Sequence, residues 1–118
     1  MSSFIEKTIK GNKVLYNITL TRGDYFAVYI NMEKDGEVYT PPADGALRFA
    51  LKKRYTDPDE KLIIRKDIPL DTRLLELEGS DTKPLDFSTY DWDIEYTDPQ
   101  GHPDTILEGK LKIDREVY

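Results

Sequence analysis

The stretch that decides the fold class reads Thr89-Tyr90-Asp91-Trp92-Asp93-Ile94-Glu95-Tyr96. Large apolar or aromatic residues alternate with acidic ones, and a period of two places successive side chains on opposite faces of a β-strand. A strand with one dry face and one wet face is typical of antiparallel sheets that pack on each other. We therefore expect an all-β protein.

The same alternation recurs on both sides of this stretch, between turn signals rich in Gly, Pro, Asp and Asn. Residues expected to face inward are Val14, Tyr16, Ile18 and Leu20; Phe26, Val28, Ile30 and Met32; Leu47, Phe49 and Leu51; Leu62 and Ile64; Leu75 and Leu77; and Leu107, Leu111 and Ile113. Asp35-Gly36 predicts a hairpin into Val38 and Tyr39. The pattern predicts one domain over residues 1–118, an immunoglobulin-like antiparallel β-sandwich of about seven to nine strands.

Helical structure is expected in one short segment. Asp81-Thr82-Lys83-Pro84-Leu85 is compatible with a single turn that has Asp81 as its N-cap, and Pro84 limits its length. Tyr90 follows this segment at the start of the strongest strand. In immunoglobulin-like sandwiches a Tyr in such a place hydrogen-bonds back to the preceding corner, and we expect the same of Tyr90.

Composition excludes several classes of function. The 118 residues include no Cys, which excludes disulfides, thiolate metal sites and cysteine nucleophiles. The net charge of −6 argues against nucleic acid as a partner. The longest apolar run, Phe26–Ile30, is far short of the roughly 20 residues of a membrane helix. Residues 1–13 lack an apolar signal segment, so we expect no membrane partner and synthesis in the cytoplasm.

Catalytic signatures are missing as well. His102 stands in a loop, without an activated-serine motif or a Gly-rich phosphate loop anywhere in the chain. We therefore predict a protein that is not an enzyme, with no catalytic, cofactor-binding or metal-binding residue. Paired carboxylates for glycoside hydrolysis stay open on residue count alone.

Two acidic groups keep calcium binding open as an alternative. They are Asp57, Asp59 and Glu60 in a turn, and Asp91, Asp93 and Glu95 on the wet face of one strand. For the second group we favour cross-strand ion pairs with Lys110, Lys112 and Arg115.

A candidate interface surrounds the second apolar run. If Phe26 and Val28 face the core, Tyr25 and Tyr29 lie on the outer face, where tyrosines supply contact area at low entropic cost. The preceding turn, Arg22-Gly23-Asp24, is expected to be exposed. The interface residues predicted are Tyr25, Tyr29, Arg22 and Asp24. The turn also spells the tripeptide that integrins recognise, although three residues often match by chance.

Several segments together resemble a known family. They are Ile18-Thr19-Leu20-Thr21-Arg22-Gly23-Asp24, Leu47-Arg48-Phe49-Ala50-Leu51-Lys52-Lys53, Asp81-Thr82-Lys83-Pro84-Leu85, Thr89-Tyr90-Asp91-Trp92-Asp93-Ile94-Glu95-Tyr96, and Asp104-Thr105-Ile106-Leu107-Glu108-Gly109-Lys110-Leu111 with Glu116-Val117. Their order resembles small immunoglobulin-like domains encoded in prophages of Gram-positive bacteria. These domains are similar to the N-terminal domain of phage baseplate upper proteins.

The resemblance implies a structural protein of the virion. It implies a non-enzymatic module of a phage tail or baseplate that docks to other tail proteins and ends in the virion, with a homo-oligomer left open. Because no receptor-binding region follows Tyr118, an accessory or adaptor role is expected. A carbohydrate- or surface-ligand-binding β-sandwich is the alternative, and a small enzyme is the third hypothesis.

Overall fold

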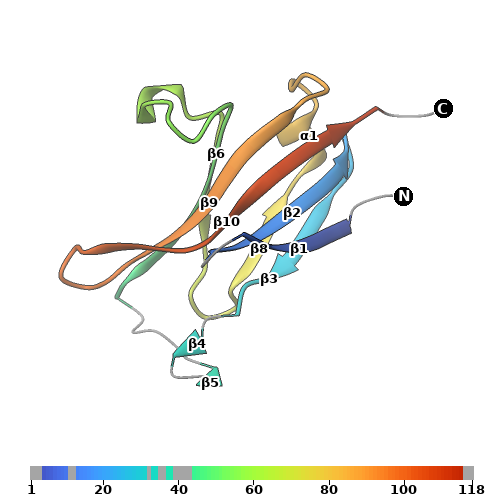
Figure 1. The fold of residues 1–118 in the computed structure, drawn as a ribbon. Helices are drawn as coiled ribbons and strands as arrows, with labels where there is room; N and C mark the ends of the chain where they lie inside the picture. Colours follow the sequence, from blue (N-terminus) through green and yellow to red (C-terminus); the bar gives the residue numbers. More distant parts are fainter. Residues whose placement is uncertain (1–3, 11–12, 32, 35–36, 39–43, 116–118) are drawn as a thin grey trace.

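A computed structural model describes residues 4–10, 13–31, 33–34, 37–38 and 44–115. These residues form ten strands, one α-helical turn and one 3-10 turn (Figure 1). The strands are β1 (Phe4–Lys10), β2 (Lys13–Thr21), β3 (Phe26–Tyr29), β4 (Glu33–Lys34), β5 (Glu37–Val38), β6 (Ala46–Lys52), β7 (Ile64–Ile68), β8 (Leu74–Leu77), β9 (Thr89–Thr97) and β10 (Pro103–Asp114). The helical turns are η1 (Asp59–Lys61) and α1 (Gly79–Thr82). The expectation of an all-β protein is confirmed.

The strands form two layers with the core between them. One sheet has six strands in the order β1-β2-β10-β9-β6-β7, and β3 pairs with β8 in a second sheet on one face of it (Figure 1). The core joins the two layers and includes Leu20, Phe26, Phe49, Leu51, Leu75, Leu77, Trp92, Ile94, Leu111 and Ile113. The short strands β4 and β5 pair on either side of residues 35–36, at the predicted hairpin, whereas Tyr39 lies outside the described residues.

The predicted inward stripes are confirmed at most positions. The buried members are Ile18, Leu20, Phe26, Ile30, Leu47, Phe49, Leu51, Ile64, Leu75, Leu77, Leu111 and Ile113. Tyr16, Val28, Leu62 and Leu107 are half-buried, and Met32 lies outside the described residues. Val14 is exposed, so the prediction is wrong there.

The expectation of purely antiparallel sheets is wrong at the centre of the large sheet. β10 runs parallel to β2, with Leu111 opposite Ile18 and Ile113 opposite Leu20. An alternating pattern specifies which face of a strand is buried and favours antiparallel partners, but it does not fix the direction of each partner. The strand β1 was also absent from the prediction. It pairs antiparallel with β2 along its whole length, although Lys7 interrupts the apolar alternation between Ile5 and Ile9.

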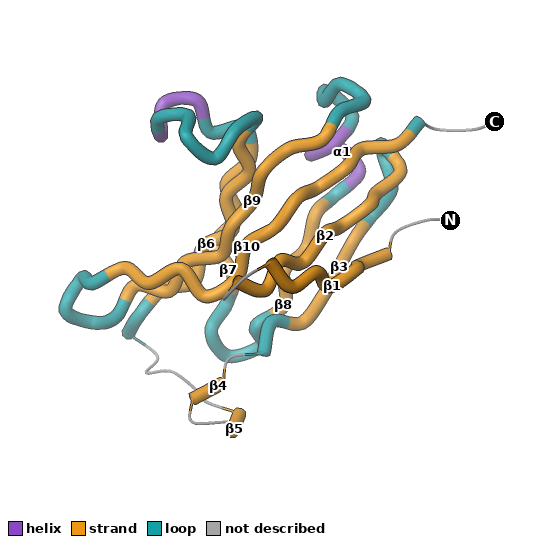
Figure 2. Tube along the Cα trace, in the orientation of Figure 1, coloured by secondary structure: helices purple, strands orange, loops and turns teal. Residues whose placement is uncertain are grey.

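The helical turn α1 begins earlier than predicted. Glu78 is its N-cap, and the backbone N–H of Glu78 donates to Asp81 Oδ2 at 2.7 Å. Asp81 therefore closes a capping box from the third helical position and is not itself the N-cap. Figure 2 shows the helical turns confined to two connecting loops. No helix among the described residues is long and apolar enough to cross a membrane.

The prediction for Tyr90 is confirmed. Its ring is buried, and its hydroxyl donates to the backbone carbonyl of Asp86 at 3.0 Å. Burial also raises the pKa of the phenol, so it stays protonated and able to donate. This bond fixes the loop after α1 against the start of β9.

Replacing Tyr90 with Phe is expected to lower the free energy of unfolding by about 1 kcal/mol, because one partly buried hydrogen bond is lost. Urea denaturation followed by Trp92 fluorescence measures the change. Tyr29→Phe, at an exposed position, is the matched control and is expected to leave stability unchanged. Equal losses in the two variants would show that the bond to Asp86 contributes nothing specific.

Candidate functional site

The two predicted interface tyrosines lie where the sequence predicts them. Tyr25 is 55% exposed and Tyr29 is 67% exposed, and both face away from the core beside the buried Phe26. The opposite strand β8 adds Glu76, which pairs with Ala27. We call the outward side of β3 and β8, with Tyr25, Ala27, Tyr29 and Glu76, the tyrosine face.

A hydrogen bond fixes one of these rings. The Tyr25 hydroxyl donates to Glu76 Oε2 at 2.5 Å. This bond to a carboxylate raises the pKa of Tyr25 to about 12. The phenol therefore remains a donor at physiological pH, and its bond links the residue before β3 to β8. A side chain ordered before binding loses less entropy when a partner arrives.

The turn before β3 is built into the fold. Gly23 has a φ of +89°, and its N–H donates to the buried Thr82 Oγ1 at 2.8 Å. Arg22 is half-buried. Its Nη1 donates to the Leu85 carbonyl at 3.4 Å, and its guanidinium lies 4.3 Å from the centre of the Phe87 ring. Arg22 therefore supports the turn, which leaves Asp24 as its exposed charged residue. An integrin-type display of the Arg22 side chain does not fit this packing.

An apolar groove opens between the layers beside Tyr29. Its volume is about 270 Å³, and Ile18, Val28, Leu75, Trp92 and Ile94 are among the residues that line it. Ile5, at the edge of the large sheet, is 43% exposed at this groove. Tyr29 thus belongs both to the tyrosine face and to the lining of the apolar groove.

The side chains on the outer face of the large sheet are less exposed to solvent than predicted. The side chains of Arg48, Asp93 and Glu95 are only 21%, 19% and 28% exposed. Ala50, on the same face between Arg48 and Lys52, is buried. These residues line a second groove of about 320 Å³. Tyr55 and Leu62, from the loop between β6 and β7, also line it. We call it the polar groove.

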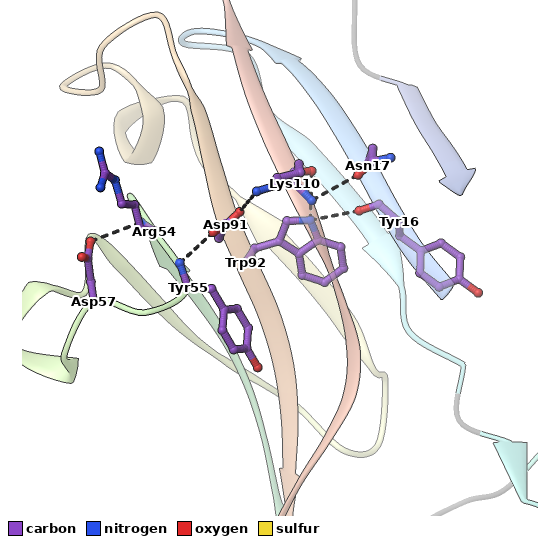
Figure 3. Close-up of polar contacts among 8 residues, drawn as sticks. All are labelled: Tyr16, Asn17, Arg54, Tyr55, Asp57, Asp91, Trp92 and Lys110. Carbon is purple, nitrogen blue, oxygen red and sulfur yellow. Dashed lines mark hydrogen bonds and ion pairs between the residues drawn. The ribbon is translucent and has the colours of Figure 1, made fainter. Parts of the chain in front are cut away.

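The predicted ion pairs on this face are confirmed in part. Lys110 Nζ lies 2.5 Å from Asp91 Oδ1 (Figure 3). Asp93 and Glu95 instead share Arg48 on β6, at 3.5 and 3.3 Å. Of the other predicted cations, Lys112 pairs with Asp114 at 3.6 Å and Arg115 lies over Phe87. Arg48 is not among the predicted cations because it lies on β6, which pairs with the edge of β9 opposite to β10.

The described acidic side chains do not gather into a metal-binding arrangement, and the side chain of Asp59 lies outside the description. Within the described parts of the chain, no three His, Cys, Asp or Glu side chains lie together in a way that could hold a cation. Asp57 Oδ2 accepts the backbone N–H of Arg54 at 3.2 Å and so shapes its own turn. Burial raises the pKa of Asp93, and Arg48 partly opposes that rise.

His102 is exposed in a tight loop. The Asp98 carboxylate accepts the backbone N–H of His102 at 2.8 Å and that of Gln100 at 3.0 Å. The bond from the His102 backbone is the main cause that lowers the pKa of Asp98. The His102 side chain is 80% exposed. Asp98 therefore acts as a turn-forming residue, as its place in an Asp-Pro-Gln-Gly sequence favours.

No protein-family model, curated protein or solved structure matches the chain.

Proposed function

We propose that the chain is a non-enzymatic interaction module of a phage or prophage tail or baseplate, and that it docks to other tail proteins through the tyrosine face. The observation that carries the docking role is the exposure of two large aromatic side chains on one outer sheet face. Aromatic residues are enriched at the centres of protein interfaces. The phage context comes from the sequence resemblance alone.

An immunoglobulin-like sandwich is part of this proposal. Its support is the two-layer arrangement around one core, together with the bond from Tyr90 to the Asp86 carbonyl. Such a tyrosine at the start of a late strand is a hallmark of immunoglobulin-like domains. The parallel pairing of β2 with β10 departs from the purely antiparallel form that the sequence predicts.

The groove beside Tyr29 extends the docking surface. An interface gains most from a side chain that enters a pocket and becomes fully desolvated there. The apolar groove of about 270 Å³ has room for aliphatic or aromatic side chains of a partner. Tyr25 and Glu76 would then form the polar side of the contact, and the groove its apolar side.

Tyr25→Ala and Tyr29→Ala are each expected to weaken docking at least tenfold, as hot-spot truncations do. The measurement is binding of the purified variants to tail proteins encoded beside this gene, by biolayer interferometry, with light scattering for self-association. Tyr55→Ala is the matched control, because Tyr55 is 52% exposed on the other layer. Unchanged association in both tyrosine variants would remove the tyrosine face from the proposal. Flanking metabolic genes would remove the phage context.

A further inference from the structure

The polar groove is held open by a loop with fixed ends. At the β6 end, Lys52 Nζ donates to the Asp57 carbonyl at 2.9 Å. At the β7 end, the Ile63 N–H donates to the Leu51 carbonyl at 2.8 Å. Between them the backbone N–H of Tyr55 donates to Asp91 Oδ2 at 2.7 Å (Figure 3). Hydrogen bonds within the chain therefore hold the wall of the groove in place, as is usual for small-molecule sites.

The charges that line the groove balance. Arg48, Lys52 and Arg65 contribute three cations, and Asp91, Asp93 and Glu95 contribute three carboxylates. Neither a strongly anionic nor a strongly cationic ligand is favoured by such a set, because each would meet like charges at short range. The groove instead offers donors and acceptors side by side.

Part of this hydrogen-bonding capacity is unused within the described structure. Asp93 Oδ1 is buried and has no hydrogen-bond partner, and Arg48 approaches it only to 3.5 Å. The ion pair with Arg48 is too long for a hydrogen bond, and a buried acceptor that lacks a hydrogen bond is costly and rare in folded proteins. A ligand hydroxyl both donates and accepts, so it satisfies a carboxylate and a guanidinium at once.

The ring of Tyr55 supplies the apolar element. It lies beside the polar lining with about half of its surface exposed, and Leu62 and Ala50 add further apolar contact. A volume of about 320 Å³ is at the lower end of the range for ligand pockets, so the occupant is small. An uncharged ring with hydroxyl groups at its edge and C–H groups on its face matches this combination.

From this combination we propose that the polar groove binds a neutral saccharide of one or two rings, with Arg48, Asp93 and Glu95 bonded to its hydroxyls and Tyr55 packed on its ring. This role is separate from docking, since the groove lies on the large sheet and the tyrosine face on the β3–β8 pair. The polar groove is thus the proposed site for the alternative function, a carbohydrate-binding β-sandwich.

The test is a titration of ¹⁵N-labelled protein with glucose, galactose, rhamnose, N-acetylglucosamine and lactose, each to about 50 mM, with glucose 6-phosphate as an anionic probe. At least one neutral sugar is expected to give saturable shifts in the amides of Tyr55 and of β6 and β9, with a millimolar Kd. Tyr55→Ala is expected to raise that Kd at least tenfold, and Tyr55→Phe to keep it within about threefold.

Two further variants control this result. Glu95→Gln keeps the shape of the side chain and removes one acceptor, so a weaker Kd with an unchanged fold in the spectrum supports direct contact. Tyr25→Ala, at an equally exposed ring on the other layer, is expected to leave the Kd unchanged. The proposal is overturned if no neutral sugar gives saturable shifts, if only the phosphate does, or if Tyr55→Ala has no effect.

Discussion

Trp92→Ala is expected to lower the free energy of unfolding by about 4 kcal/mol, the range measured for large aromatic residues cut back to Ala in protein cores. The indole is 4% exposed, lies 5.8 Å from the ring of Phe49 and fills the space between the layers. Its Nε1–H lies 3.1 Å from two carbonyl oxygens, those of Tyr16 on β2 and Lys110 on β10 (Figure 3). One side chain thus bridges three strands of the large sheet.

The change is measured by urea denaturation followed by far-ultraviolet circular dichroism, because the variant lacks the only Trp of the chain. Trp92→Phe separates the two contributions. It keeps most of the apolar area but removes the N–H, so a smaller loss of about 2 kcal/mol is expected. Tyr55→Ala serves as the exposed control, with a change within about 0.5 kcal/mol. A loss below about 1 kcal/mol for Trp92→Ala would contradict the central place of this residue.

Gly109→Ala is expected to lower the free energy of unfolding by about 3 kcal/mol, and Gly109→Val by more. Gly109 lies in β10 opposite Trp92, at the approach of β10 to β2. A Cβ at this position would overlap the carbonyl oxygen, the carbonyl carbon and the backbone nitrogen of Tyr16. Because backbone cannot rotate away as a side chain does, the strands must separate.

Gly101 provides the control for Gly109. It has a φ of +88° and no neighbouring atom within 4 Å of an added Cβ. Gly101→Asn, a residue that tolerates this conformation, is expected to cost no more than about 1 kcal/mol. Denaturation midpoints followed by Trp92 fluorescence compare the two positions. Because Gly109 lacks a positive φ, a loss at Gly109 no larger than that at Gly101 would contradict the predicted overlap with Tyr16.

Features that depend on neighbouring residues were predictable from the sequence. Alternation alone predicted that Phe49 and Ile94 are buried, and it predicted that Tyr25 and Tyr29 face outward because adjacent residues of a strand point to opposite sides. The bond of Tyr90 was predictable for the same reason, since its acceptor on Asp86 is four residues away.

Features that depend on residues distant in the sequence were not predictable. Arg22 was predicted to be exposed. Nothing near it in sequence indicates that its guanidinium donates to the Leu85 carbonyl and lies over the Phe87 ring. The polar groove arises because the loop after β6 is tied to Asp91 on β9, which is 36 residues from Tyr55. No local pattern indicates that a predicted wet face is partly covered in this way.

The parallel pairing of β2 with β10 also constrains the order in which the chain folds. Ile18 and Leu111 are partners in the sheet although almost the whole chain separates them. Bringing together two strands that are so far apart in sequence costs loop-closure entropy and makes folding slow. During synthesis on the ribosome, β2 has only β1 as a partner in this sheet until β10 has emerged. The large sheet is therefore completed only after β10 has emerged, and until then the free edge of β2 is open to pairing with other chains.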